Sequence, residues 1–454
     1  MKRLIALSST AALAACNLAP TYVRPVAPVP PAWPSGAAYP AADAGQKAGL
    51  PWTALIGDER LRTIIQRALA NNRDLRVTLA NVLAARAQYR IQRAAQLPTV
   101  TADAGASFAR RNGERQDSYS ADVGFSAFEI DLFGRLRNLS EAALQSYLAT
   151  QEGARSARIA LVAETASAYA TLAADQQLLA VSRDTLASAE RTLTLTRSLN
   201  GVGLSGKLDV HQAETIVEQA RSDVASAVTQ VAQDRNAIDL LAGAPIEDAL
   251  LPVSLSALIG STAQAPAGMS SDVLLQRPDV LEAEHRLQAA NADIGAARAA
   301  MFPKISLTAA IGVASSALSS LFSGGAFSWN AAPSASLPIF GGGVRGNIEY
   351  SKAQRDAAVA AYEGAIQSAF REVSDALARA GTISDQQRAQ RALVLSNEQA
   401  YALSEQRYRA GIDPFLTTLV NQRSLYSARR SAIGTDLALM QNRIALYRAI
   451  GADF

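Results

Sequence analysis

The side chains that most often carry enzyme chemistry are scarce in this sequence. The chain has two histidines, His211 and His285, which lie far apart and have no cluster of metal-ligating residues around them. We therefore expect neither a zinc site nor a histidine-based catalytic triad, and we predict that both histidines lie on helix surfaces. An exported enzyme on a helical scaffold would need a polar site that the sequence does not show. The prediction is that the chain has no catalytic residue, no metal and no cofactor.

One glycine pattern matches the spacing of a dinucleotide-binding motif. Gly341, Gly343 and Gly346 have the spacing G-x-G-x-x-G and stand between a predicted strand and a predicted helix, as a dinucleotide-binding turn does. The segment before them contains Pro333 and Pro338 and alternates with polar residues, unlike the apolar strand of a buried parallel sheet. We therefore predict that the glycines let the chain turn from a strand into a helix.

Cys16, the only cysteine, has a sequence context that indicates covalent modification. Residues 1–15 contain two basic residues, an apolar stretch and two final alanines, which is the pattern of an export signal. Cys16 follows directly, as in a bacterial lipobox, so we expect its sulfur to carry a diacylglycerol, with palmitate among the acyl chains. Asn17 comes next instead of the aspartate that retains lipoproteins in the inner membrane, which favours the outer membrane. The alternative is an ordinary signal peptide beside an incidental cysteine.

The composition restricts the possible partners. The 43 basic and 40 acidic residues leave a formal charge of +3 and form no basic block, so nucleic acid is not an expected partner. A hydrophobic content of 49% is ample for a folded chain. After the first 15 residues no apolar run reaches the roughly 18 residues of a membrane-spanning helix. Any membrane span is therefore predicted to be built from strands.

The chain contains an internal duplication. Asp74 precedes Pro98 by the same interval that separates Asp279 from Pro303, and Phe133-Gly134 returns as Phe340-Gly341. Two copies of about 205 residues follow, a period far longer than that of solenoid repeats. The predicted organisation is a signal peptide (1–15), a lipid-anchored proline-rich tether (16–57), a first repeat (58–243), a linker (244–271) and a second repeat (272–454). The tether should run extended without a core of its own.

Each copy contains two segments in which apolar and polar residues alternate. A period of two over about ten residues is typical of a tilted outer-membrane strand with one face to lipid and one to water. Half-buried strands of a soluble sandwich fit the same pattern locally. Segments 111–118 and 315–325 are expected as hairpin loops. Four strands cannot close a barrel, so several copies must share one. The residues expected on the lipid face are Val100, Phe108, Phe125, Ile305, Leu307 and Trp329.

Two other segments predict very long helices. Residues 135–200 and 344–410 contain no proline, and at about 1.5 Å per residue each helix would be on the order of 100 Å long. Apolar residues recur every seven positions, which predicts left-handed coiled-coil packing. The rows are Leu172, Leu179, Leu186 and Leu193; Val210, Val217, Val224, Val231 and Ile238; and Leu419, Tyr426, Ile433, Met440 and Tyr447.

These features together resemble the outer-membrane efflux protein family, the TolC-like channels, and within it the lipoprotein branch that serves resistance-nodulation-division multidrug pumps. The most specific motifs are Arg277-Pro278-Asp279-Val280, Phe128 to Arg135, Leu337-Pro338-Ile339-Phe340 and Leu446 to Gly451. The resemblance implies a mainly α fold with a membrane β part. Long coiled-coil helices would form a periplasmic α-barrel, and each protomer would add four strands to a shared trimeric 12-stranded β-barrel. The implied partners are two further copies, a periplasmic membrane-fusion adaptor and an inner-membrane proton-driven transporter.

The resemblance also assigns roles to individual positions. Two hairpin turns look like adaptor-docking tips, with Gly203 and Leu204 in the first and Gly411 and Ile412 in the second. Leu416, Val420 and Arg423 match the constriction of the family, and the carboxylates expected to hold Arg423 are Asp209 and Asp413. Val420 departs from the aspartate that relatives commonly carry, so closure by an apolar ring of Leu416 is expected here. The alternatives are plain hairpin turns and coiled-coil seam residues.

The functional hypothesis is a passive exit duct in the outer membrane for drugs or other small molecules. The composition of the duct does not reveal its substrates, because selection is expected in the transporter. A duct for protein secretion is one alternative. A structural lipoprotein that spans the periplasm without transport is another, but a mere spacer would not need the four alternating segments.

Overall fold

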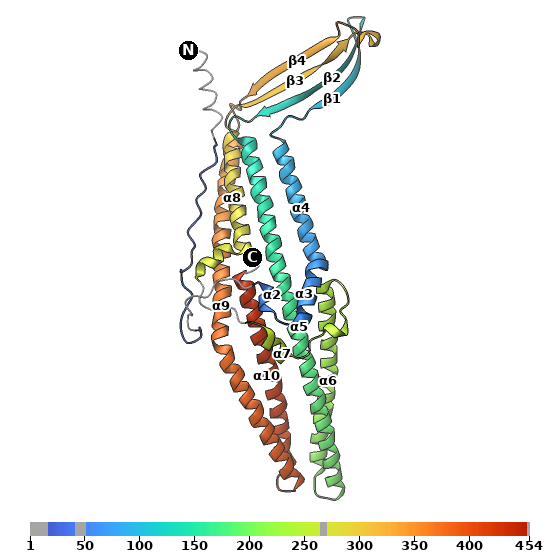
Figure 1. Ribbon diagram of the computed structural model, residues 1–454, viewed down its shortest axis with the longest axis vertical. Helices are drawn as coiled ribbons and strands as arrows, with labels where there is room; N and C mark the ends of the chain where they lie inside the picture. Colours follow the sequence, from blue (N-terminus) through green and yellow to red (C-terminus); the bar gives the residue numbers. More distant parts are fainter. Residues whose placement is uncertain (1–16, 41–50, 264–269, 452–454) are drawn as a thin grey trace. The chain divides into compact units, whose positions relative to one another are not determined.

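Two very long helices dominate the computed structural model, which describes residues 17–40, 51–263 and 270–451 (Figure 1). Helix α5 runs over Arg135–Gly201 and α9 over Gly342–Arg409, with 67 and 68 residues, which confirms both predicted helices. Short turns connect α5 to α6 (Lys207–Ala242) and α9 to α10 (Phe415–Ile450). Within the described ranges, no helix combines the length and hydropathy that crossing a membrane requires.

The chain divides into two compact units, and each unit takes segments from both halves of the sequence. The first unit contains the N-terminal residues up to Ala27 together with residues 80–153 and 281–365. The second contains residues 28–79, 154–280 and the rest of the chain from residue 366. The boundaries fall inside α5, α9, α4 (Arg73–Ala94) and α8 (Pro278–Ala299). The units therefore differ from the two sequence repeats, whose limits stay a prediction.

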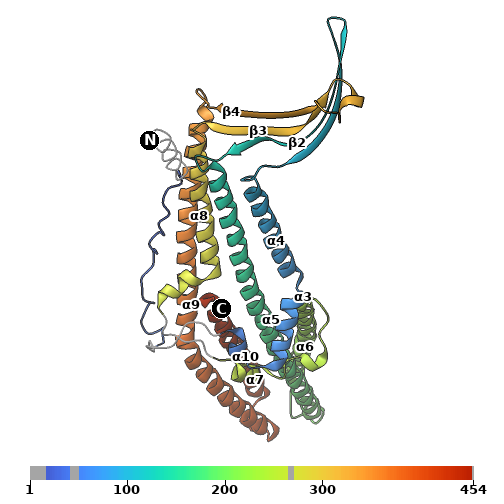
Figure 2. The same ribbon diagram turned by 45° about the horizontal axis from the view of Figure 1, so that its top comes forward.

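The first unit contains one antiparallel sheet with the strand order β1-β2-β3-β4 (Figures 1 and 2). The strands are β1 (Thr101–Arg111), β2 (Glu114–Ile130), β3 (Lys304–Ser315) and β4 (Phe327–Ser336), so the four predicted strands are confirmed. The predicted loop over 111–118 is wrong. β1 and β2 pair as far as Arg111 and Glu114, and the turn is only Asn112-Gly113 with φ of 52° and 86°. Positive φ at both positions suits the right-handed twist of a hairpin.

The register places the apolar residues of all four strands on one face. Phe108 lies opposite Asp117 at the far end of the first hairpin, while Ala121, Val123 and Phe125 of β2 lie opposite Val313, Ile311 and Ala309 of β3. Ile305, Leu307 and Ile311 of β3 in turn lie opposite Ala335, Pro333 and Trp329 of β4. Because alternate residues share a face, the predicted strand residues are confirmed to lie on one face, and its contact with lipid stays a prediction; Val100 precedes β1.

One irregularity in β2 was not predicted. The register shifts between Phe125 and Phe128, and Ala127 has a positive φ of 50°. The Ala127 N–H donates to Thr308 Oγ1 over 3.0 Å. Strict alternation after Phe125 would put Ala127 on the apolar face, but the bulge places Phe128 and Ile130 there instead. The extra residue keeps both faces uniform to the end of the strand.

The second unit has its main core beneath short helices. This core joins side chains of α5, α6 and α10 to residues of α2 (Trp52–Leu55), α3 (Glu59–Asn71) and α7 (Leu255–Ser261). Two short 3₁₀ segments, Asp248–Leu250 and Ser271–Gln276, complete the connections. No member of the three predicted seven-residue rows is exposed, and Met440 is fully buried. The helical packing therefore uses the predicted rows.

The N-terminal segment is extended, as predicted, but it is firmly attached. Residues 17–40 form no helix or strand. In the first unit, the Arg24 guanidinium donates to both carboxylate oxygens of Glu284 over 2.8 and 2.6 Å, and the Tyr22 hydroxyl donates to the same group over 3.0 Å. The Glu284 side chain is only 6% exposed, so its charge depends on these donors. In the second unit, Trp33 stacks on Phe370 with 5.0 Å between ring centroids.

Candidate functional site

The polar face of the sheet carries hydroxyl and carboxylate groups. Asp103 of β1 lies directly opposite Asp122 of β2. Glu129 accepts hydrogen bonds from Arg135 over 2.7 and 2.6 Å and lies 3.3 Å from Lys304 Nζ. A sheet with one apolar face and one hydrated polar face can separate an apolar environment from water.

The turn between α5 and α6 presents two of the predicted tip residues. Gly203 adopts a left-handed φ of 77°, which favours glycine, and the Leu204 side chain is exposed. The Leu204 N–H donates to the Leu199 carbonyl over 2.9 Å, which closes the end of α5. Asp209 accepts from the Ser205 hydroxyl over 2.8 Å and the Gly206 N–H over 3.2 Å. Asp209 thus caps the start of α6 in this protomer.

The turn between α9 and α10 also has a left-handed glycine and an exposed apolar residue, but an ion pair stabilises it. Gly411 has a φ of 68°, and Ile412 is exposed at the tip. Both carboxylate oxygens of Asp413 accept from the Arg407 guanidinium, over 2.7 and 2.9 Å. The hydrogen bonds from Arg407 and its positive charge hold the pKa of Asp413 below its ordinary value. This bidentate pair fixes the shape of the second tip.

The three predicted constriction residues lie along the first turns of α10. Leu416 and Val420 are 55% and 53% exposed, so neither belongs to the core of the protomer. Arg423 is also exposed, and among the described residues it has no ion-pair partner. Asp209 and Asp413, the acids expected to hold it, are engaged by the α6 cap and by Arg407. Neither acid is bonded to Arg423 in this protomer.

Hydrogen bonds between the two hairpins were missed at the sequence level. Tyr408 and Phe415 pack with Leu193 of α5 and Val217 of α6 in a small core near the turns. The Tyr408 hydroxyl lies 3.1 Å from Thr196 Oγ1, and this pair is buried. Similar hydroxyl pairs join Ser188 to Tyr401 and Ser182 to Tyr426, over 2.8 and 3.2 Å. These bonds attach α9 and α10 to α5.

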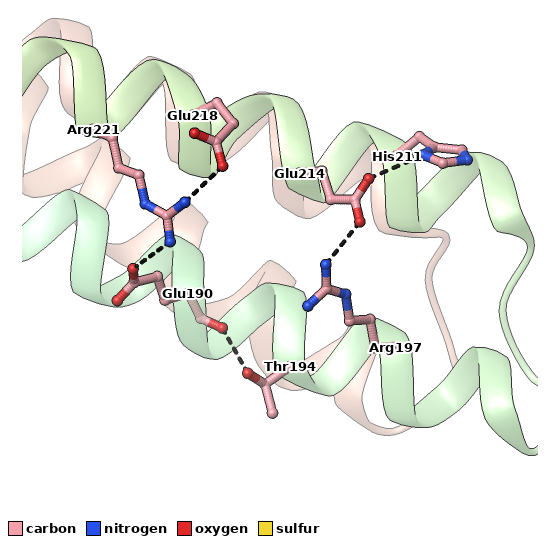
Figure 3. Close-up of polar contacts among 7 residues, drawn as sticks. All are labelled: Glu190, Thr194, Arg197, His211, Glu214, Glu218 and Arg221. Atoms are coloured by element: carbon pink, nitrogen blue, oxygen red, sulfur yellow. Dashed lines mark hydrogen bonds and ion pairs between the residues drawn. The ribbon is translucent and has the colours of Figure 1, made fainter.

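A surface network joins α5 to α6 close to the first turn (Figure 3). Glu214 of α6 accepts from Arg197 of α5 over 2.8 Å and lies 3.0 Å from His211 Nδ1. Arg221 donates to Glu218 over 2.7 Å and to Glu190 of α5 over 3.2 Å. Exposed pairs of this kind stabilise a protein only modestly.

The two histidines have different surroundings in the structure. His211 is 74% exposed on α6, which agrees with the prediction. His285 of α8 is half-buried and its Nδ1 lies 2.7 Å from Gln145 Oε1, so this residue joins two helices instead of facing solvent freely. Within the part of the chain that is described, no group of three or more potential ligands could hold a metal. Cys16 lies outside the described residues.

The glycine run opens α9. Gly343 and Gly346 belong to the first turns of that helix, and the chain passes from the last residue of β4 to Gly342 in a few residues. None of the three pattern glycines needs a left-handed φ. The prediction of a strand-to-helix turn agrees with this placement.

Several known proteins are similar to this chain in both sequence and fold. A sequence profile described as outer membrane efflux protein matches residues 64–244 and 269–452. The probable efflux pump outer membrane protein TtgC of Pseudomonas putida is 46% identical over 466 aligned residues, covering 100% of this chain and 96% of that protein. A membrane protein from Pseudomonas aeruginosa, known from a crystal structure, is 43% identical with a TM-score of 0.90 over 96% of this chain and 100% of that one. The open state of the MtrE outer membrane channel of Neisseria gonorrhoeae matches at 34% identity with a TM-score of 0.87, over 96% and 98%. The chain belongs to the outer membrane efflux protein family.

Proposed function

We propose that this protein is the outer-membrane exit duct of a tripartite efflux pump, which passively conducts drugs or other small molecules out of the cell. The observation that carries the proposal is a membership in the efflux family along nearly the whole chain, joined to a sheet with one apolar and one polar face. The apolar face suits lipid and the polar face suits a water-filled lumen. A duct of this kind makes and breaks no covalent bond.

The protein acts as a homotrimer in this proposal. Four strands are too few to close a barrel, and an open sheet edge in lipid leaves backbone groups without hydrogen bonds. Three copies give twelve strands, and the long helices of the three copies form an α-barrel in the periplasm. A lipid on Cys16 holds the start of each protomer at the outer membrane.

The two hairpin turns are the proposed contacts for a periplasmic membrane-fusion adaptor. Gly203, Leu204, Gly411 and Ile412 form these tips, and the two apolar side chains are 77% and 62% exposed. Exposed apolar side chains at a defined turn are suited to packing against a partner protein. An inner-membrane transporter driven by protons supplies the substrates and the energy.

The proposed gate is an apolar ring near these tips. Exposed Leu416 side chains of three copies would meet at the axis and exclude water, which stops ions. Arg423 would then bond to an acid of a neighbouring copy, with Asp209 on the first hairpin and Asp413 beside the second turn as the candidates. Leu416→Ser and Arg423→Ser should each raise the resting conductance, whereas Val420→Asp should add cation selectivity. Unchanged conductance in all three assembled variants would place the gate elsewhere.

Complementation of efflux tests the function. The host keeps an adaptor and a transporter of a resistance-nodulation-division pump but lacks its outer-membrane component. Expression of this chain should lower the accumulation of a fluorescent dye that the pump exports, and a transporter that cannot use protons should abolish the effect. A secretion duct would instead release a reporter protein into the medium, and a structural lipoprotein would change neither readout.

A further inference from the structure

Two arginines end the apolar face of the first hairpin. Arg110 of β1 lies directly opposite Arg115 of β2, in the last paired position of that face before the turn. Phe108 and Tyr119 precede them on the same face, because alternate residues of a strand share a face. The two rings lie edge to face with 5.8 Å between centroids, and the Arg115 guanidinium lies 5.8 Å from the Phe108 centroid. Aromatic rings and guanidinium groups therefore form one continuous surface.

The place of this pair along β1 matches one edge of a membrane. The apolar alternation begins at Val100, and Arg110 continues it at the other end of the strand. A strand rises about 3.4 Å per residue, and a tilt of about 40° leaves a height of about 26 Å between these two residues. The apolar band of an outer-membrane barrel is about 25 Å tall. Arg110 therefore stands where the hydrocarbon ends and the lipid headgroups begin.

The pair lies at the end of the sheet that is remote from the helices. β1 follows α4 and β2 precedes α5, so the turn between the strands is at their opposite ends, as Figure 2 shows. β2 pairs with β3 only from Tyr119 onward, so the hairpin also extends beyond its neighbour. With the helices in the periplasm, this turn points to the cell exterior. The outer leaflet there consists of lipopolysaccharide, whose lipid A carries phosphate groups.

Both guanidinium groups have donors available for a ligand. Arg110 donates through Nε to the Gly113 carbonyl over 3.3 Å, and Arg115 donates through Nε to Asp117 over 2.7 Å. Among the described residues, the terminal amino groups of these two arginines have no hydrogen bond or ion pair. The Arg115 side chain is 72% exposed, and Arg110 is exposed as well. A ligand can therefore reach the ends of both side chains.

The charges of this face call for an anion. Like charges directly opposite each other destabilise a pair of strands. Asp117 offsets the charge of Arg115, whereas Arg110 has no acidic partner in the part of the chain that is described. A phosphate group accepts parallel hydrogen bonds from the planar guanidinium fork, which makes arginine well suited to bind it. A phosphate beside the two arginines would satisfy their free donors and reduce their repulsion.

We infer that Arg110 and Arg115 bind the phosphate groups of lipopolysaccharide, and that Phe108 and Tyr119 pack against its acyl chains. The ligand is a lipid whose phosphorylated head and apolar body match the two parts of this surface. The inference rests on the proposed duct for the orientation of the sheet, and it adds a bound lipid to that duct.

Native mass spectrometry of delipidated full-length trimers tests the inference, with purified bisphosphorylated lipid A as the probe. The parent protein should bind one lipid A per protomer. Arg110→Gln and Arg115→Gln should each weaken binding about ten-fold, which is the change that one charge-assisted hydrogen bond supplies. Arg110→Lys should weaken binding less than Arg110→Gln, because it keeps the charge and loses only the fork.

A matched control removes two exposed arginines far from the sheet in sequence. Arg388 and Arg391 of α9 are 79% and 61% exposed, and each lies near an acid, as Arg115 does. The double variant Arg388→Gln with Arg391→Gln should bind lipid A as the parent protein does. An equal loss of binding in this control and in Arg110→Gln with Arg115→Gln would show that only net charge matters, and would overturn the site.

Two other lipids identify what the parent protein recognises, even if the double variant fails to assemble. Lipid A without its phosphates should bind at least about ten-fold more weakly than the bisphosphorylated form. Phosphatidylglycerol, with a single phosphate diester, should also bind more weakly. Equal binding of the dephosphorylated lipid would show recognition of acyl chains alone and overturn the inference. Equal binding of phosphatidylglycerol would overturn the assignment to lipopolysaccharide.

Asp117 offers a different route to the same lipid, because Mg²⁺ can join a carboxylate to a phosphate. Binding through the arginines should persist when a chelator removes divalent cations. Binding that requires Mg²⁺ and survives both glutamine substitutions would overturn the inference. Trimers that conduct ions but do not bind lipid A would overturn the inference alone, whereas trimers that bind lipid A and pass no current would contradict the proposed function.

Discussion

Arg277 binds three separate parts of the second unit, and its replacement should release the end of α10. Its side chain is 6% exposed. The guanidinium donates to Asp279 over 3.0 and 2.7 Å, to Glu372 of α9 over 2.9 Å and to the backbone carbonyl of Ala449. Gly451 ends α10 beside it in a left-handed conformation with φ of 70°. Arg277→Met keeps an unbranched apolar stem but removes all of these donors.

The expected loss of local stability depends on which partners of Arg277 stay buried without a hydrogen bond. Removing one partner of a buried ion pair costs about 3 to 5 kcal/mol, and an orphaned buried carbonyl costs about 1 to 3 kcal/mol. The side chains of Asp279 and Glu372 are 39% and 32% exposed, so water can hydrate both carboxylates after the substitution. The lower end of the range is therefore expected, about 3 kcal/mol, which corresponds to about a hundred-fold change in an equilibrium constant.

Hydrogen exchange of the last turn of α10 measures this release. Amides of residues 446–450 should exchange about a hundred-fold faster in Arg277→Met, because the local opening becomes easier. The exchange rate in Arg277→Lys should lie between those of the parent protein and Arg277→Met, because an ammonium group cannot reproduce the planar, forked guanidinium. The control is Arg286→Met, which removes an exposed i,i+4 pair with Glu282 from α8. Equal exchange in Arg277→Met and Arg286→Met would refute the reasoning.

Three further predictions concern charge, membrane and lipid. Burial and the nearby carboxylate of Asp234 raise the pKa of Asp175 from 3.8 to about 6, so the folded state holds a proton that the unfolded state releases. The stability of the folded state should therefore fall as the pH rises from 3.8 to about 6. In Asp175→Asn the thermal unfolding temperature, measured from pH 4 to 7, should no longer show this fall. Leu307→Arg on the apolar face should cost about 2 to 4 kcal/mol and lower trimer yield more than Thr308→Arg; equal yields would contradict the assigned faces. The intact mass of the mature protein should begin at a lipid-bearing Cys16, and an unmodified thiol there would contradict the anchor.

Regular patterns made the strands and the long helices predictable. A period of two fixes which residues share a face, so the apolar face was correct from Phe108 to Trp329. The bulge at Ala127 was missed because Ser126-Ala127 continues the alternation in sequence and departs from it only through backbone geometry. The predicted loop over 111–118 is too long because polar residues also occur in the paired ends of β1 and β2. Asn112-Gly113 is itself a strong signal for a two-residue turn.

Most long-range contacts of the structure cannot be predicted from local sequence patterns. Arg277 was recognised as part of a motif, but Glu372 and Ala449 lie 95 and 172 positions away in sequence. Tyr408 and Thr196 are separated by 212 positions. The pair between Arg407 and Asp413 spans only six positions, and opposite charges across a tight turn could have been inferred. For the same reason Asp413 is less free to hold Arg423 than the sequence indicated.

Electrical recording from the assembled protein tests most directly whether it is a duct. Trimers purified with their lipid anchors are inserted into a planar bilayer, and single-channel currents are compared between the parent protein and Leu416→Ser. A passive duct with an apolar gate should show a small resting conductance that rises several-fold in the variant, because a hydroxyl ring no longer excludes water. Intact trimers that insert into the bilayer and pass no current in either form would contradict the proposed function.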